Sequence, residues 1–229
     1  MSLRIGLYEF FAYTIPGVFY IIITMFALTI FGFVQFDLER LLNLSLFSFL
    51  VLLGAGYITG LLIDSIAYRW YLLFINRQGA AKYVALEEFL ALHPWVILDY
   101  KPEDWSILLN AVKNKSIDTA MDIEQHNVAS IMLRNISLSF MLISIIFLLR
   151  FIIVNPDYWN LIIFGFTLLL SIIAIRRSKR RRHWFYMGIF DAFVAIYYLP
   201  DKNTDHISKG KSEGSDVDIV DDSDLTHNN

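Results

Sequence analysis

The chain of 229 residues contains no cysteine and few charges. Without cysteine it can form no disulfide, no thiolate metal site and no cysteine nucleophile. Only 18% of its residues are charged and 56% are hydrophobic, a composition too apolar for an ordinary soluble domain. The sequence also lacks a phosphate-binding loop, a His-Glu-x-x-His motif, a Gly-x-Ser-x-Gly motif and a dinucleotide-binding glycine pattern. These absences disfavour an enzyme, and we expect no cofactor and no resident metal.

Long apolar runs dominate the chain instead. Tyr158–Ile175 carries no charge over 18 residues, and a helix of that length measures about 27 Å, close to the roughly 30 Å hydrocarbon core of a bilayer. Phe10–Phe36 and Leu41–Ile63 are also free of charge and long enough. The first run exceeds the apolar core of a signal peptide, so we expect it to be retained as a span.

A fourth apolar run, Asn135–Leu149, is shorter. It reaches spanning length when Ile131–Leu133 or Phe151–Val154 is included. Either extension places Arg134 or Arg150 near an interface, where a long side chain can extend its charge to water. The sequence therefore predicts an all-α, polytopic integral membrane protein with four transmembrane helices and a small helical insertion.

Basic residues are concentrated directly after the last apolar run. Cytoplasmic loops carry an excess of Lys and Arg, whereas the two short loops that join the predicted hairpins are poor in both. We therefore expect the chain to lie in the inner membrane, with both termini and the insertion in the cytoplasm. The six basic residues of this block are Arg176, Arg177, Lys179, Arg180, Arg181 and Arg182.

The chain divides into five segments on these patterns. Residues 1–64 and 131–175 form the two predicted transmembrane hairpins, and 65–130 form the insertion between them. Residues 176–200 contain the basic block and a further apolar helix, which we expect either at the membrane interface or folded onto the insertion. Residues 201–229 carry eight acidic residues and three lysines, and we expect them to be disordered.

The insertion has a helical pattern. Tyr83, Leu86, Phe89 and Leu90 share one side of a predicted helix over 80–92. A second helix buries the apolar positions Trp105, Leu108, Leu109 and Val112. Ser116 is a suitable cap for a third helix that continues into the next span. So small a segment cannot bury a large core alone, and we expect it to pack on the protruding ends of the spans, on a second copy or on a partner protein.

Gly56, Gly60 and Asp64 fall on one face of the second span. Glycines four residues apart let another helix approach closely, and on this basis we predict helix packing and a homo-oligomer. An acidic residue at membrane depth is costly and either serves a pathway or pairs with a cation. For Asp64 we consider an ion or proton site, and also a simple pair with Arg4 or Arg69.

Two other polar groups are candidates for chemistry. Glu9 stands at the start of the first span, before a proline that can kink the helix, and could form part of a gate or of an ordinary interfacial entry. Asp118, Asp122 and His126 share a helix face at four-residue spacing, which suits either a metal-dependent hydrolase or a plain water-exposed surface.

The basic block has two interpretations of its own. It can contact anionic lipid headgroups, at about 1 kcal/mol per charge near the surface, or it can serve only to fix the orientation of the chain. We expect no nucleic acid partner.

The segments Tyr8–Phe10, Ile15–Gly17 and Gly56–Gly60 resemble a pattern in small uncharacterised bacterial four-span membrane proteins, some of them encoded beside antiphage defence genes. The resemblance implies a membrane sensor or effector in antiviral defence and carries over no functional residue. Three hypotheses follow from the sequence: a non-enzymatic sensor or effector with a cytoplasmic protein partner, a small transporter or channel using Asp64 and Glu9, and a membrane-bound hydrolase.

Overall fold

The computed structural model describes residues 3–35, 45–74, 81–96, 100–154 and 156–198. No strand occurs in these ranges, and four of the helices are long and apolar enough to cross a membrane. The predicted all-α class with four candidate spans is confirmed. The elements are α1 (Leu3–Ile30), α3 (Leu46–Leu73), α4 (Ala81–Leu92), a 3-10 turn (Pro102–Asp104), α5 (Trp105–Lys115), α6 (Ile117–Leu149), its π-helical end (Arg150–Val154) and α7 (Tyr158–Tyr197).

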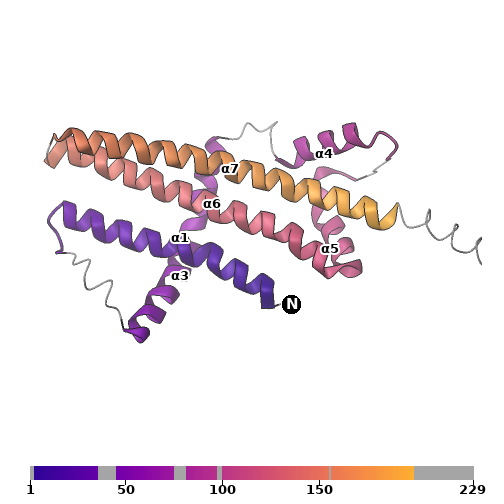
Figure 1. Cartoon of the computed structure of the whole chain (residues 1–229), viewed down its shortest axis with the longest axis horizontal. Helices are drawn as coiled ribbons and strands as arrows, with labels where there is room; N and C mark the ends of the chain where they lie inside the picture. The colour runs from indigo at the N-terminus through magenta and orange to yellow at the C-terminus, as the bar shows by residue number, and fades with distance from the viewer. Residues whose placement is uncertain (1–2, 36–44, 75–80, 97–99, 155, 199–229) are drawn as a thin grey trace, which may run out of the picture.

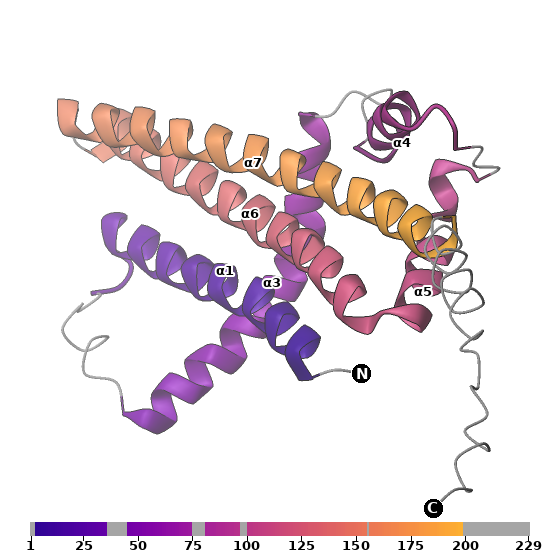
Figure 2. The same cartoon turned by 45° about the vertical axis from the view of Figure 1, so that its right-hand side comes forward.

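The long helices form two hairpins that contact each other. Figure 1 shows α6 and α7 side by side along their length, with α1 next to α6. α3 crosses this group obliquely in both views and contacts α1 and α6 (Figure 2). The C-terminal end of α1 and the turn between α6 and α7 lie at one end of the molecule. The N-terminal end of α1 lies towards the other end, where α4 and α5 pack.

Side-chain caps set where three helices begin. Ser45 Oγ accepts the amide of Ser48 at the start of α3, and Asp157 Oδ1 accepts the amide of Trp159 at the start of α7. Ser116 Oγ accepts the amide of Thr119 at 3.4 Å, so the predicted cap of α6 is confirmed. These short polar side chains satisfy amides that have no partner within the first helical turn.

α6 and α7 are longer than a membrane requires. α7 contains 40 residues, which corresponds to about 60 Å, twice the roughly 30 Å thickness of a hydrocarbon core. α6 runs without a break from Ile117 into the third span, as predicted. The segment boundaries expected at 130/131 and 175/176 therefore fall inside continuous helices. About half of this hairpin extends beyond the apolar part of the chain.

The extended half of the hairpin supplies the core on which the insertion packs. Phe185, Ile189 and Phe190 of α7 are buried in one cluster with Phe89 of α4 and with three apolar positions of α5: Leu108, Leu109 and Val112. The insertion thus packs on the protruding end of α7, the first of the three arrangements considered. The described part of residues 184–199 folds onto the insertion, one of its two expected placements.

The predicted buried side of α4 is only partly right, since Phe89 is buried and Leu86 packs against the cluster but the other two residues do not. Ala81, Ala85 and Phe89 face the cluster, whereas Tyr83 and Leu90 are exposed. The prediction gave weight to the larger side chains and missed the small ones. Alanine at i and i+4 lets α4 approach α7 closely enough for the tilted rings of Phe89 and Phe190 to pack with their centroids 5.7 Å apart.

Candidate functional site: a polar network between the spans

The carboxylate of Asp64 on α3 is bound by Arg134 and Asn135 on α6. Arg134 Nη2 donates to both carboxylate oxygens, at 2.8 and 2.7 Å, and Asn135 Nδ2 donates to Oδ1 at 3.1 Å. The described partner is therefore Arg134 and not Arg69, the nearer arginine in the sequence. The side chain of Arg4 lies outside the described residues.

This ion pair is largely shielded from solvent. The side chain of Arg134 is 11% exposed and that of Asp64 is 21% exposed. The expectation that Arg134 extends its charge to water is corrected, because the guanidinium turns to Asp64 and lies 5.2 Å from the ring centre of Tyr68. Two opposite charges at this depth neutralise each other, whereas either one alone would be costly to bury.

Hydrogen bonds beside the pair involve the other two long helices as well. Tyr20 of α1 donates from its hydroxyl to the carbonyl oxygen of Asn135 at 2.7 Å. Trp70 of α3 donates to Ser137 Oγ on α6 at 3.2 Å, and Ser137 bonds in turn to Ser171 of α7. All four candidate spans therefore contribute to two neighbouring groups of polar contacts, which we together call the polar network.

Serines at seven-residue spacing join α6 to α7. Ser137 Oγ donates to the carbonyl of Ser171 at 2.9 Å, and Ser171 Oγ donates back to the carbonyl of Ser137 at 2.8 Å. Ser130 and Ser178 repeat the same reciprocal pair at 3.0 and 2.8 Å. Ser144, one heptad further, donates to a carbonyl of α7 at 3.3 Å. This ladder fixes the register of the hairpin with small side chains that keep the backbones close.

Two buried polar atoms beside the network have no hydrogen-bond partner among the described residues: Asn135 Oδ1 and the hydroxyl of Tyr71. Asn135 itself is fully buried. An unpaired polar atom in an apolar surrounding costs free energy. These two atoms therefore leave one hydrogen-bond acceptor and one hydroxyl group unused beside the network.

Gly56 and Gly60 lie where α3 crosses α1. A Cβ atom on Gly60 would fall 2.8 Å from the carbonyl carbon of Tyr13, and one on Gly17 would fall 2.7 Å from the amide nitrogen of Gly60. Only glycine permits this approach of the two backbones. The stripe is thus occupied within the chain by α1, so it does not supply the surface on which the homo-oligomer was predicted.

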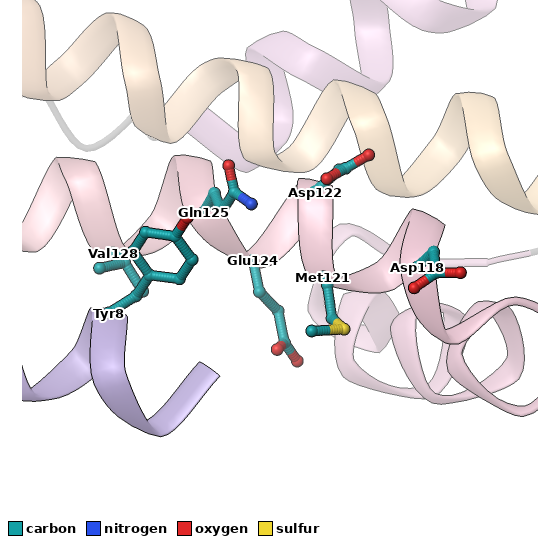
Figure 3. Close-up of a pocket in the computed structure, with 7 residues that line it drawn as sticks. All are labelled: Tyr8, Asp118, Met121, Asp122, Glu124, Gln125 and Val128. Atoms are coloured by element: carbon teal, nitrogen blue, oxygen red, sulfur yellow. The ribbon is translucent and has the colours of Figure 1, made fainter. Parts of the chain in front are cut away.

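The structure places the remaining acidic candidates apart from this network. Glu9 lies in α1, but its side chain is outside the described residues. Asp118 and Asp122 line a pocket between the start of α1 and α6, in which Asp122 and Glu124 point to different sides of the helix (Figure 3). His126 lines a different pocket together with Asp122, where its Nδ1 lies 3.2 Å from Arg181 on α7. Within the described ranges no three His, Asp or Glu side chains are arranged to hold a metal ion.

The six residues of the basic block fall into two groups. Arg181 contacts His126, and Arg182 donates to Asn127, so these two guanidinium groups bind α6. The other four are exposed, and none of them forms an ion pair with a described carboxylate: Arg176, Arg177, Lys179 and Arg180. The block is therefore partly structural and partly open.

Sequence reasoning missed the partner of Asp64 and the serine ladder. Arg134 is an isolated cation in an apolar run, just as Asp64 is an isolated acid, and that complementarity was a readable signal. The heptad spacing of the serines was another. Comparison with known protein families, curated proteins and solved structures finds no match to this chain.

Proposed function

We propose that this chain is a non-enzymatic membrane effector or sensor component. In this proposal the helical insertion receives a ligand or a partner protein, and a change in its packing passes to the spans. The observation that supports the proposal best is the continuity of α6 and α7, which run without a break from the buried cluster around Phe89 to the polar network at Arg134.

The two ends of that path are packed differently. At the insertion, α4 and α5 attach to α7 through apolar side chains, together with exposed contacts such as Glu88 with His183 at 2.9 Å. Between the spans, α6 and α7 are held by reciprocal serine bonds, and α6 contacts α3 through the Asp64–Arg134 ion pair and a few hydrogen bonds. A displacement of α4 or α5 would move α6 and α7 as one unit and would strain the contact between Asp64 and Arg134.

Orientation and setting complete the proposal. We place the insertion and both termini in the cytoplasm and the spans in the inner membrane, and the basic block after the last span supports this orientation because cytoplasmic loops carry an excess of Lys and Arg. A role in bacterial antiphage defence rests on the sequence resemblance alone. A single cysteine at the exposed Ile107 tests the orientation, because the chain has no other cysteine. A membrane-impermeant maleimide should label it only after the cells are permeabilised.

A coupling experiment tests the function directly. Phe89→Ala loosens the insertion core, and Val84→Ala removes an exposed side chain from the same helix as the control. Spin labels on cysteines at Leu50 and Leu169, both exposed on the long helices, report the distance between α3 and α7. We expect Phe89→Ala, but not Val84→Ala, to shift that distance and to change dye leakage from proteoliposomes. An unchanged distance, sealed liposomes and no partner recovered from pull-downs would together overturn the proposal.

The transporter hypothesis has less support. Asp64 is neutralised by Arg134, so an ion or proton site there would first require the pair to open. Flux measurements on Asp64→Asn proteoliposomes separate the two hypotheses, since only a transporter would lose flux while its assembly stays intact. The hydrolase hypothesis has no assembled centre in the part of the chain that the structure describes.

A further inference from the structure

A groove along α7 is lined by residues of one helix face. Their spacing of three and four residues puts them in a single line, with an apolar residue at the span side, four arginines in the middle and a tryptophan at the far side. We call it the Trp184 groove, and its lining residues are Ile173, Arg176, Arg177, Arg180, Arg181 and Trp184.

The Trp184 groove lies where the apolar part of α7 ends. Ile173 belongs to the uncharged run that closes at Ile175 and is half exposed. From Arg176 to Arg181 the helix rises about 7.5 Å, which is similar to the depth of one headgroup layer of a bilayer. Tryptophan is favoured at this level because its ring is apolar and its N–H is polar. The order along the groove thus follows the order of a lipid: acyl chain, phosphate, outer headgroup.

The charges of the groove are open to an anion. No acidic side chain lines it, and Arg176, Arg177 and Arg180 form no ion pair within the described part of the chain. The guanidinium of Arg180 lies 5.1 Å from the ring centre of Trp184, and that of Arg181 lies 5.5 Å from it. These contacts hold planar donor groups over a fixed surface, which suits phosphate oxygens better than mobile lysines would.

A second groove on the neighbouring side of α7 provides a contrast. It also contains Arg176 and Arg180, but it is shared with α4 and includes Glu88 and His183. Glu88 lies 2.9 Å from His183 Nε2, so this groove already holds a carboxylate beside its basic residues. Of these two grooves, Lys179 lines the second and Arg177 lines the Trp184 groove.

We propose that the Trp184 groove binds the phosphate of an anionic phospholipid. Arg176, Arg177 and Arg180 receive the phosphate, and one acyl chain follows the exposed face of the span past Ile173. If the basic block served only to fix the orientation of the chain in the membrane, its positive charges would have to be present, but their arrangement on the helix would not matter. The site is independent of the sensor proposal, since lipid binding needs no movement of the insertion.

The experiment measures phosphatidylglycerol retained by the purified full-length protein in detergent, by native mass spectrometry, with phosphatidylcholine as the neutral comparison. Arg177→Gln and Lys179→Gln remove the same charge from exposed positions two residues apart, so they form a matched pair. We expect Arg177→Gln to lower the phosphatidylglycerol affinity about fivefold and Lys179→Gln to lower it less than twofold. Circular dichroism checks that both variants keep their helices.

Two results would overturn the proposal. Equal losses in the two variants would mean that the basic block attracts lipid through its total charge and has no defined groove. Displacement of phosphatidylglycerol by millimolar inorganic phosphate would make the ligand a free phosphate and not a lipid. If Arg177→Gln misfolds, Arg177→Lys replaces it, because this variant keeps the positive charge. We expect it to lower the phosphatidylglycerol affinity about twofold, because lysine lacks the forked donor of arginine.

Discussion

Arg134 on α6 binds Asp64 on α3 through both carboxylate oxygens, although the two residues are 70 positions apart in the sequence. The pair joins the α1–α3 hairpin to the α6–α7 hairpin at a level where the surrounding helices are apolar. Asn135 donates to the same carboxylate, and its carbonyl accepts from Tyr20. The Asp64 carboxylate thus binds two side chains of α6, and Asn135 connects it to α1.

Removing either partner of this pair should destabilise the protein. Asp64→Asn leaves the Arg134 guanidinium shielded from solvent without its counter-charge, and we expect a loss of about 3 kcal/mol in the free energy of unfolding. Arg134→Gln should cost a similar amount, because it leaves the Asp64 carboxylate alone. Unfolding in mixed micelles at increasing SDS fraction measures both changes.

Two controls make that prediction specific. Arg69→Gln removes an exposed arginine of α3, the helix that carries Asp64, and should change the free energy of unfolding by less than about 0.5 kcal/mol. The double variant Asp64→Asn/Arg134→Gln should be at least about 1 kcal/mol more stable than the sum of the two losses implies, because no buried charge remains. Strict additivity in this cycle would contradict the pairing.

The sequence was sufficient for the class of the protein and insufficient for this contact. Charge-free runs and the basic block depend on local composition, so the four candidate spans could be read directly. The partner of Asp64 depends on how α3 crosses α6, and that crossing is set by packing at a distance in the chain. Neighbouring Arg69 was considered first because helical spacing reveals only contacts within one helix.

The crossing of α1 and α3 should be sensitive to a single methyl group. In Gly60→Ala the new Cβ would lie 2.8 Å from the carbonyl carbon of Tyr13, so the backbones must separate. We expect a loss of about 1–3 kcal/mol, the usual range for an overpacked contact. Gly54→Ala is the matched control in the same helix, since a Cβ there meets nothing within 4 Å. It should be neutral or slightly stabilising by helix propensity.

The glycine variants are compared by the midpoint of their thermal unfolding in detergent, which is monitored through the helical circular dichroism signal. A destabilised Gly60→Ala with an unchanged Gly54→Ala supports the close approach. If both variants unfold at the wild-type temperature, the two helices are not in backbone contact.

The serine ladder should contribute in small, separate steps. Ser171→Ala removes the donor to the Ser137 carbonyl, at about 0.6 kcal/mol for an interhelical bond of this kind, and leaves the Ser137 hydroxyl bonded to the backbone carbonyl of position 171. The double variant Ser137→Ala/Ser171→Ala should lose about the sum of the two single variants, because each substitution removes a different hydroxyl-to-carbonyl bond. Ser65→Ala, at an exposed position of α3, is the control for loss of a hydroxyl alone. Chemical unfolding of all four proteins checks the order.

The packing of the insertion could be predicted only in part from the sequence, for a different reason. Its helices follow from local periodicity, and Leu108, Leu109 and Val112 are buried as the spacing indicated. The face of α4 was misjudged in part, because the buried positions Ala81 and Ala85 are small and carry little hydrophobic signal. Their burial depends on Phe190 and its neighbours on α7, more than a hundred residues later, so no window on α4 alone contains that information.

A pH-dependent contact ties α4 to the turn before α5. Lys82 Nζ lies 2.7 Å from Glu103 Oε1, and the Tyr83 hydroxyl donates to the same oxygen at 2.5 Å. These hydrogen bonds, led by that from Lys82, lower the pKa of Glu103 to about 2. A carboxyl pKa that is lower in the folded state than its ordinary value near 4.3 contributes stability above that value. The contribution is lost as the pH falls from about 4 through about 2.

We therefore expect Glu103→Gln to speed amide exchange in α4 at pH 7 and to have no effect relative to wild type near pH 2. The contact is exposed, so 1 M salt should also reduce the difference between the two proteins. Hydrogen exchange followed by mass spectrometry resolves the α4 peptide under all three conditions. Glu87→Gln removes an exposed carboxylate of α4 without such a partner in the described chain and should leave exchange unchanged. A difference between Glu103→Gln and wild type that persists at pH 2 would mean that the side chain acts through its shape and not through its charge.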